Sequence, residues 1–271
     1  MTDDLSWVPP GVDTGRANVA RVYDYWLGGS HNFLADRDAA RAIVAVEPNT
    51  REGVRANRAF LGRAVRFLAA SGIRQFLDIG SGIPTEGNVH EVAQRASPGA
   101  HVVYADVDKV AVAHSREILT GNPAAAVIEA DLRDPEKILT SDTVRSLIDF
   151  AQPVGLLLNC VLHFIDDSEE PWQIVATLRE ALAPGSYLVL AHGTSEARPT
   201  VARAAETVYN RSVTTSIHMR TLSEVLRFFD GFDLVDPGLV YIPQWRPDSP
   251  GDVPEDPGKF WVLVGAGRKA S

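Results

Sequence analysis

The chain has 271 residues, of which 45% are hydrophobic, so it can bury a substantial core, and its formal net charge of −9 opposes non-specific binding of nucleic acid. The single cysteine, Cys160, excludes an internal disulfide framework, and we therefore expect a reducing, cytoplasmic location. The acidic N-terminus does not resemble a secretory signal, and no apolar run approaches the roughly 20 residues of a membrane-spanning helix, so we expect no membrane association.

The first 70 residues are predicted to form a helical cap. Its last helix places apolar residues such as Val54, Leu61, Val65 and Leu68 at helical spacing. The predicted helices cover Val19 to Leu27, Leu34 to Val46 and Thr50 to Ala70. We expect about a dozen residues before them to be disordered.

In the first of these helices, Arg21 and Tyr25 lie four residues apart and therefore share one face. We expect this face to contact a ligand, although packing in a core would explain the neighbouring Tyr23 and Trp26 equally well. The loop that follows, Gly28 to Asn32, is either a plain connection or a lid over a substrate.

Between residues 73 and 192, short apolar runs alternate with helix-like stretches, which indicates βαβ units and a parallel sheet. The runs lack strict alternation of polar and apolar residues, as is typical of strands covered by helices on both faces. The predicted strands are Gln75 to Ile79, His101 to Ala105, Ala126 to Glu129, Val154 to Leu158 and Tyr187 to Ala191, and the predicted helices are Val89 to Arg95, Val110 to Leu119 and Pro171 to Leu182.

The C-terminal part is predicted to complete the same sheet. It contains a helix at Leu222 to Phe229, short strands at Phe232 to Val235 and Val240 to Ile242, a loop at Pro243 to Gly258 and a last strand at Phe260 to Val264. We therefore predict one compact α/β domain over residues 71–271, with a mainly parallel seven-stranded sheet and an antiparallel last strand, covered by the helical cap of residues 1–70.

The first strand runs into a glycine-rich turn, with the sequence Asp78-Ile79-Gly80-Ser81-Gly82. Glycine lets the backbone approach a ligand closely, because it has no Cβ and adopts unusual dihedral angles. A dinucleotide-binding turn would have a third glycine three positions after Gly82, where this chain has Thr85. The turn therefore indicates a nucleotide-like ligand and disfavours a nicotinamide dinucleotide.

Carboxylates follow the next two predicted strands, at Asp106 and at Asp131. Because ligands of open α/β sheets bind at the carboxyl ends of the strands, we expect both to reach the same ligand as the glycine turn. Asp106 could accept hydrogen bonds from ribose hydroxyls, and Asp131 could accept one from the adenine amino group while Leu132 covers the ring. Helix capping is the plain alternative for both acids.

Asn159 directly follows the fourth predicted strand, and Val161 and His163 come shortly after it. These positions would lie beside the reacting end of a ligand, where an acceptor would meet it. His163 is a candidate general base, as is Tyr23 in the cap, while a structural histidine bonded to backbone is the alternative. His90, Glu91 and His114 lack the paired spacing of a metal centre, and we predict no metal site.

The order of these motifs resembles the class I S-adenosylmethionine-dependent methyltransferases over about residues 73 to 192. A narrower resemblance, to a bacterial S-adenosyl methyltransferase family of unassigned substrate, covers most of the chain. It rests on Ala20 to Gly29, Asn32-Phe33, Asn57 to Phe60, Phe76 to Pro84, Gly87 to Glu91 and Pro184 to Leu188.

The resemblance implies a Rossmann-like fold with S-adenosylmethionine as cofactor and with the N-terminal helices lying over it. It also implies that Asp78 orders the glycine turn or meets the amino-acid end of the cofactor through water. The residues expected to bind the cofactor are Asp78, Gly80, Ser81, Gly82, Asp106, Val107, Asp131, Leu132, Asn159, Val161, Arg21 and Tyr25.

We therefore predict transfer of a methyl group to an unidentified acceptor, which we expect to be a small molecule. Methyl transfer from a sulfonium mainly requires that two reactants be aligned and water excluded, so few catalytic residues are needed. Two alternatives stay open at this point: a nicotinamide-dependent oxidoreductase, and a module that binds S-adenosylmethionine as a sensor without catalysis.

Overall fold

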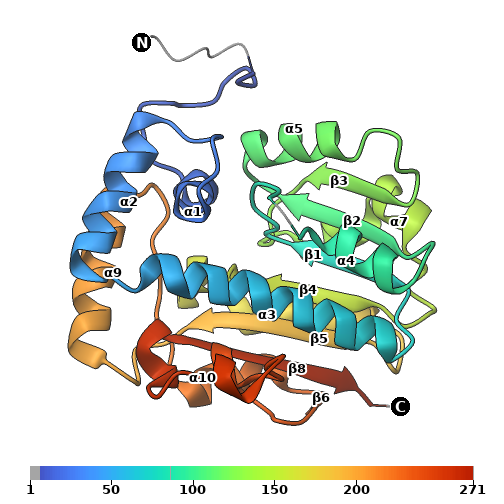
Figure 1. Cartoon of the computed structure of the whole chain (residues 1–271). Coiled ribbons are helices and arrows are strands. Elements are labelled where there is room, and N and C mark those ends of the chain that lie inside the picture. The colour runs from blue at the N-terminus through green and yellow to red at the C-terminus, as the bar shows by residue number, and fades with distance from the viewer. Residues whose placement is uncertain (1–6, 86, 271) are drawn as a thin grey trace.

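The computed structural model describes residues 7–85 and 87–270 (Figure 1). The first six residues of the predicted cap, which belong to the segment expected to be disordered, lie outside these described residues. Within the described residues, no helix is both long enough and apolar enough to cross a membrane.

Eight strands of the described chain form one sheet, in the order β3-β2-β1-β4-β5-β8-β6, with β7 paired to β8. They are β1 (Gln75–Ile79), β2 (His101–Asp106), β3 (Ala125–Glu129), β4 (Gly155–Asn159), β5 (Tyr187–Gly193), β6 (Phe232–Leu234), β7 (Val240–Tyr241) and β8 (Val262–Lys269). The first five strands are parallel, and β8 is antiparallel to β5, β6 and β7. The predicted, mainly parallel Rossmann-like sheet is confirmed. It has eight strands where seven were predicted, because the two residues of β7 also pair with β8.

The helices are α1 (Val19–Leu27), α2 (Leu34–Val46), α3 (Thr50–Ala70), α4 (Val89–Ala96), α5 (Lys109–Ile118), α6 (Pro135–Thr140), α7 (Asp142–Leu147), α8 (Pro171–Ala181), α9 (Pro199–Ser212) and α10 (Leu222–Leu226). Side chains at the helix starts explain several of these bounds. Asn18 accepts a hydrogen bond from the backbone N–H of Ala20 at the start of α1, and Asp108 accepts two at the start of α5. At the start of α10, Thr221 and Glu224 form a capping box.

Helices cover both faces of the sheet. On one face α3 packs Phe60, Leu61 and Leu68 in the same core cluster as the strand residues Phe76 and Val102 (Figure 1). The cluster on the other face joins side chains of α6, α7, α8 and α10 to alternate residues of the central strands. Both faces of the parallel strands are therefore apolar, as their continuous hydrophobic runs predict.

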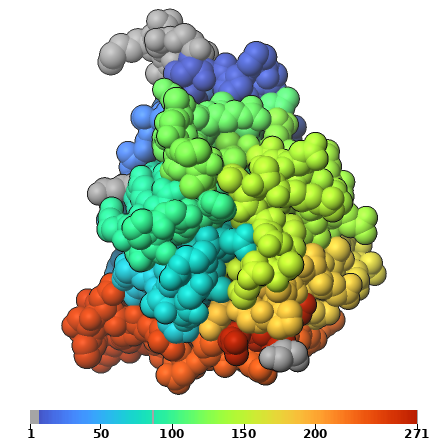
Figure 2. Space-filling model, turned by 90° about the vertical axis from the view of Figure 1, so that its right-hand side faces the viewer, coloured from blue at the N-terminus to red at the C-terminus, as the bar shows by residue number. Residues whose placement is uncertain are grey.

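A cap of α1, α2 and α9 lies over the carboxyl ends of the parallel strands (Figure 1). Its own core joins Val22 and Trp26 of α1 and Ile43 of α2 to Tyr209 of α9. Figure 2 shows the opposite end of the molecule, where the end of α3, in cyan, reaches the surface. The packing of two helices does not follow the predicted division of the chain, because α3 packs on the sheet and α9 packs in the cap. The boundary at residue 70 therefore stays a prediction.

Candidate functional site

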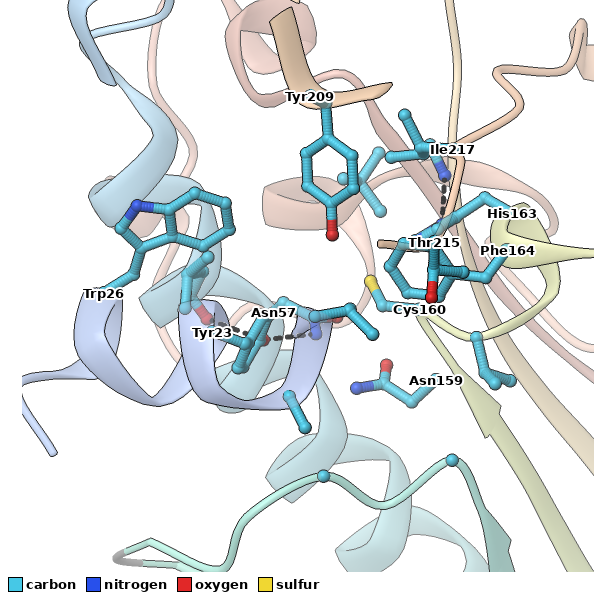
Figure 3. Close-up of a pocket in the computed structure, with 18 of the residues that line it drawn as sticks. Tyr23, Trp26, Asn57, Asn159, Cys160, His163, Phe164, Tyr209, Thr215 and Ile217 are labelled. Atoms are coloured by element: carbon cyan, nitrogen blue, oxygen red, sulfur yellow. Dashed lines mark hydrogen bonds between the residues drawn. The ribbon is translucent and has the colours of Figure 1, made fainter. Parts of the chain in front are cut away.

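A cavity of about 300 Å³ lies between the carboxyl ends of the strands and the cap (Figure 3). The turns after β1, β2, β3 and β4 line one side, and α1, α3 and α9 line the other. Of the predicted site residues, the structure brings twelve to this cavity: Tyr23, Asp78, Gly80, Ser81, Gly82, Asp106, Val107, Asp131, Leu132, Asn159, Val161 and His163.

The two glycines of the turn after β1 both have left-handed backbone, with φ of 74° at Gly80 and 68° at Gly82. The N–H of Gly80 donates to the carbonyl of Ala105 at 2.8 Å, and a Cβ at this position would lie only 2.3 Å from Cγ2 of Val161. Around Gly82, by contrast, a Cβ would meet no atom within 4 Å. Neighbouring atoms therefore enclose the backbone at Gly80, whereas the space beside Gly82 that a Cβ would occupy is free of protein atoms.

Asp106 orders this glycine turn. Its Oδ2 accepts the N–H of Gly82 at 2.7 Å, and its Oδ1 accepts the N–H of Asp108 at 2.8 Å. Burial raises the pKa of Asp106 to about 6, although these two hydrogen bonds act in the opposite direction. The role of ordering the turn, which the resemblance implies for Asp78, therefore belongs to Asp106, which also faces the cavity.

Asp78 and Arg58 lie near each other at the cavity, without a hydrogen bond between their side chains. The side chain of Asp78 accepts no hydrogen bond from any described residue, and only 3% of Asp78 is exposed. Burial raises its pKa to about 7, which nearby Arg58 opposes and Asp106 reinforces. Nε and Nη2 of Arg58 are themselves buried without a hydrogen-bond partner.

Buried polar atoms without partners gather at this cavity. In the described residues seven such side-chain atoms occur, and all but the indole nitrogen of Trp245 belong to residues that line the cavity. They include Oγ of Ser81 and Oδ1 of Asn57 and Asn159. Because native proteins rarely leave buried polar groups unpaired, these atoms are available to a ligand.

Residues that follow β2 and β3 line the part of the cavity next to Asp106. Val107 is 59% exposed although it is apolar, whereas Leu132 is buried, and both line the cavity. Asp131 accepts hydrogen bonds from the backbone N–H of Arg133 at 2.9 Å and from its guanidinium at 3.2 Å. Leu132 therefore lies where the predicted contact with a ring would form. Asp131 lines the same cavity, but its carboxylate is already paired with Arg133.

His163 lies on a 3₁₀ turn directly after β4 and is buried. Its Nδ1 accepts the N–H of Gly193 at 3.3 Å. Burial, aided by His192 and Arg220, lowers the pKa of His163 well below its ordinary value. The side chain is therefore a neutral imidazole that carries its proton on Nε2, which favours a hydrogen-bond donor over a general base.

Tyr23 meets Asn57 across the cavity wall (Figure 3). Its hydroxyl accepts from Nδ2 of Asn57 at 2.8 Å and donates to the carbonyl of Val54 at 3.4 Å. Burial raises the pKa of Tyr23 above its ordinary value, so the phenol keeps its proton. These contacts suit a residue that positions Asn57, whose Oδ1 is free for a ligand.

Two predicted residues, Arg21 and Tyr25, are not among those that line the cavity. Nε of Arg21 donates to the carboxylate of Asp36 on α2 at 3.0 Å, and its Nη2 donates to the carbonyl of Arg16 at 2.7 Å. The ring of Tyr25 lies instead under the guanidinium of Arg51. Their shared helical face therefore points away from this cavity, Arg21 joins α1 to α2, and a contact of either residue with the cofactor stays a prediction.

Sequence reasoning assigned no role to Arg58, Asn57 or Tyr209, all of which line the cavity. Asn57 and Arg58 belong to a motif that carries the family resemblance, so a signal was present. Tyr209 lies on α9, which no sequence pattern predicted. In the described residues, no group of three or more His, Cys, Asp or Glu side chains could hold a metal ion.

Comparison with known proteins gives one family and a set of similar structures. The sequence model of a family described as S-adenosyl methyltransferase matches residues 6–270. A crystal structure of a candidate methyltransferase from Thermobifida fusca is 42% identical, with a TM-score of 0.92 over 98% of this chain and 100% of that one. No curated protein matches the sequence.

Two further structures show the range of similarity. A DUF574 family protein from Streptomyces avermitilis is 37% identical, with a TM-score of 0.91 over 95% of this chain and 99% of that one. An O-methyltransferase family protein from Burkholderia thailandensis is 15% identical, with a TM-score of 0.53 over 82% of this chain and 61% of that one. The latter shares the fold alone.

Proposed function

Since the chain belongs to the S-adenosyl methyltransferase family, it is an S-adenosylmethionine-dependent methyltransferase, and we propose that its cavity holds the cofactor and a small-molecule acceptor together. No observation favours the nicotinamide-dependent oxidoreductase or the non-catalytic binding module. The cytoplasmic location and the bacterial origin expected from the sequence stay predictions.

The observation that carries this proposal is the concentration of unpartnered polar atoms around this one cavity. S-Adenosylmethionine ends in an α-amino acid, which has both a carboxylate and an ammonium group. Arg58 offers two unpaired donors for the carboxylate, and Asp78 offers an unpaired carboxylate for the ammonium. Ser81 and Asn159 have free polar atoms at the adjoining strand ends.

The adenosine would occupy another part of the same cavity. Each oxygen of Asp106 accepts one backbone hydrogen bond and keeps a lone pair for a ribose hydroxyl. Val107 and Leu132 suit the two faces of the adenine ring, because burying exposed apolar surface on a ring is favourable. Asp131 would accept the adenine amino proton beside its partner Arg133.

Catalysis needs little beyond this placement. The bound cofactor supplies a methyl group on a sulfonium, which is already a good leaving group. The cap formed by α1, α2 and α9 covers the strand ends, excludes water and leaves room for a small acceptor next to His163. We propose that this cap forms one functional unit and that two residues contact the acceptor, Tyr23 from the cap and His163 from the turn after β4.

The proposal predicts that Arg58→Ala weakens the binding of S-adenosylhomocysteine by about tenfold to a hundredfold, because a charged hydrogen bond is lost. The folded state should be unaffected, because the donors Nε and Nη2 have no partner in it. Isothermal titration calorimetry measures the affinity, and Arg55→Ala, an exposed position on α3, is the matched control.

The same titration examines Asp106→Asn, whose amide nitrogen accepts neither a backbone N–H of the turn nor a ribose hydroxyl, so this variant should also bind more weakly. An unchanged affinity in the Arg58 variant would remove the amino-acid contact from the proposal. Failure of the unmodified protein to bind S-adenosylhomocysteine at all would remove the cofactor site itself.

A further inference from the structure

Beyond the strand ends, the cavity continues under the cap into a chamber with aromatic walls. Trp26 comes from α1, Phe164 from the turn after β4 and Tyr209 from α9, while Phe260 and Trp261 precede β8. Figure 3 shows the Tyr209 hydroxyl directed into the space between Trp26 and Phe164. We refer to these five residues as the aromatic chamber.

The aromatic chamber suits a flat and largely apolar occupant. The rings of Phe164 and Tyr209 lie with their centroids 6.1 Å apart and 27° from parallel, so their faces extend one wall. Lys259, a cation at this end of the cavity, is already paired with Glu52 at 2.8 Å. Aromatic faces stack favourably on a planar ring, and the carboxylate of Glu206 on α9 also lines the cavity.

A chain of hydrogen bonds fixes which atom His163 presents to the cavity. Nη1 of Arg220 donates to Nε2 of His192 at 2.8 Å, so His192 carries its proton on Nδ1 and donates it to the carbonyl of Gly193 at 2.7 Å. The N–H of Gly193 in turn donates to Nδ1 of His163 at 3.3 Å. Nε2 of His163 therefore bears the proton and has no partner among the described residues.

Arg220 holds this arrangement rigidly. It is 2% exposed, donates to the carbonyls of Leu162 and Ile165 on either side of His163, and pairs with Asp167. Its cation, with His192 beside it, opposes a second positive charge on His163. The ring of His163 is thus kept neutral and in one orientation, as a donor.

A fixed N–H donor beside the reacting atom discriminates between nucleophiles. An aromatic ring nitrogen has one lone pair, which a hydrogen bond would occupy, whereas an oxygen can accept that bond and still present a second lone pair. Neither His163 nor Tyr23 is suited to take a proton, so an acceptor that these two residues hold is favoured when it is acidic itself. A phenol, with a pKa of about 10 as in tyrosine, ionises far more readily than an aliphatic alcohol.

We propose that the aromatic chamber binds an aromatic hydroxy compound as the methyl acceptor and that Nε2–H of His163 holds its oxygen. The proposal rests on the proposed function, which supplies the methyl donor. The hydroxyl proton is released to solvent before the cavity is filled, and the acceptor enters as its phenolate, which then lies beside the sulfonium. A lone pair of the oxygen then forms the bond to the methyl carbon, and the carbon–sulfur bond breaks with its electron pair on sulfur. A neutral ether and neutral S-adenosylhomocysteine result.

The test uses the full chain loaded with sinefungin, a cofactor analogue with an amine in place of the methylated sulfonium. The probe is 7-hydroxycoumarin, a two-ring phenol whose anion absorbs apart from its neutral form, titrated at a pH slightly below its own pKa. We expect the loaded protein to bind the probe and to enrich its anion several-fold. His163→Phe should abolish this enrichment, and His163→Gln, which keeps an N–H donor, should retain part of it.

Two variants complete the comparison. Phe164→Leu should weaken probe binding by about tenfold, because an aromatic contact is lost at similar volume. His101→Phe is the matched histidine control, because His101 begins β2 at the opposite end of the sheet and bonds the carbonyl of Leu147. It should behave as the unmodified protein does.

The outcomes separate this proposal from the proposed function. A protein that binds sinefungin but not the probe, or binds the probe only in its neutral form, overturns the acceptor assignment and leaves the cofactor site standing. Failure to bind sinefungin overturns the proposed function instead. If Glu206→Gln abolishes the anion signal while His163→Phe preserves it, a carboxylate on α9 removes the proton and the role given to His163 is wrong.

Discussion

Gly80 and Gly82 have the same left-handed backbone but different surroundings, and this difference can be measured. Gly82→Ala should cost about 1–2 kcal/mol of unfolding free energy, the strain of a Cβ at positive φ. Gly80→Ala should cost about 1–3 kcal/mol more, because its Cβ would collide with Val161, a β-branched side chain with few rotamers. Urea unfolding measures the free energy of unfolding of both variants. Equal losses of this free energy would mean that the turn of the Gly80 variant moves away from Val161.

At the scale of single residues, the sequence predicts which residues line the cavity more reliably than it predicts the contacts that these residues make. Asp78 and Asp106 were both expected at the ligand, and both line the cavity, yet only the structure shows that Asp106 binds the glycine turn. Helical spacing places Arg21 and Tyr25 on one face but does not say which direction that face points. Arg58 was missed because an arginine on a long amphipathic helix is ordinarily a solvent-facing residue.

Among the elements, the three N-terminal helices were predicted with their observed bounds. The bounds of α1, α2 and α3 agree in every residue with those expected from the sequence. By contrast, α6 and α7 have six residues each, too few to establish a period. The 14 residues of α9 escaped prediction because only Ala202, Ala205 and Tyr209 are buried, and small alanines give a weak apolar stripe.

The packing of α1 against α2 depends on one buried carboxylate. Asp36 is fully buried and accepts hydrogen bonds from Nε of Arg21 and from the backbone N–H groups of Asn18 and Phe33. Asp36→Ala should therefore lower the unfolding free energy by about 3–5 kcal/mol, because it leaves the buried guanidinium with only the more distant carboxylate of Asp108, 4.0 Å away, as a counter-charge.

Asp38→Ala is the control on the same helix, because Asp38 pairs with Arg41 at an exposed position. Its loss should cost less than about 1 kcal/mol. Chemical denaturation compares the two variants, and similar losses would show that the ion pair does not hold the cap helices together.

At the scale of the whole molecule, buried titratable groups make the free energy of unfolding depend on pH. Burial raises the pKa of Asp78 from 3.8 to about 7, so between these values the folded chain binds a proton that the unfolded chain has lost. The contribution of Asp78 is therefore favourable at low pH and is lost as the pH rises through about 7. In the opposite direction, burial lowers the pKa of His192 to about 3, which penalises folding below about pH 6.5.

Asp78→Asn isolates the first effect, because asparagine stays neutral at every pH. The variant should be more stable than the unmodified protein by on the order of 2–4 kcal/mol at pH 8, and this advantage should narrow as the pH falls toward 5. Urea unfolding across this range measures it, with the exposed Asp233→Asn as control. A constant difference would show that Asp78 is ionised in the folded protein throughout.

The cap has a consequence for how the chain is made. Helices α1 and α2 are translated well before α9, yet α2 packs against α9, and Ala17 accepts the N–H of Thr214 at 3.1 Å. About 150 residues separate the end of α2 from the start of α9, so α1 and α2 keep apolar faces uncovered until these residues have been translated. A nascent chain stalled before α9 should engage chaperones through α1 and α2, and the aromatic chamber closes only after α9 has been made.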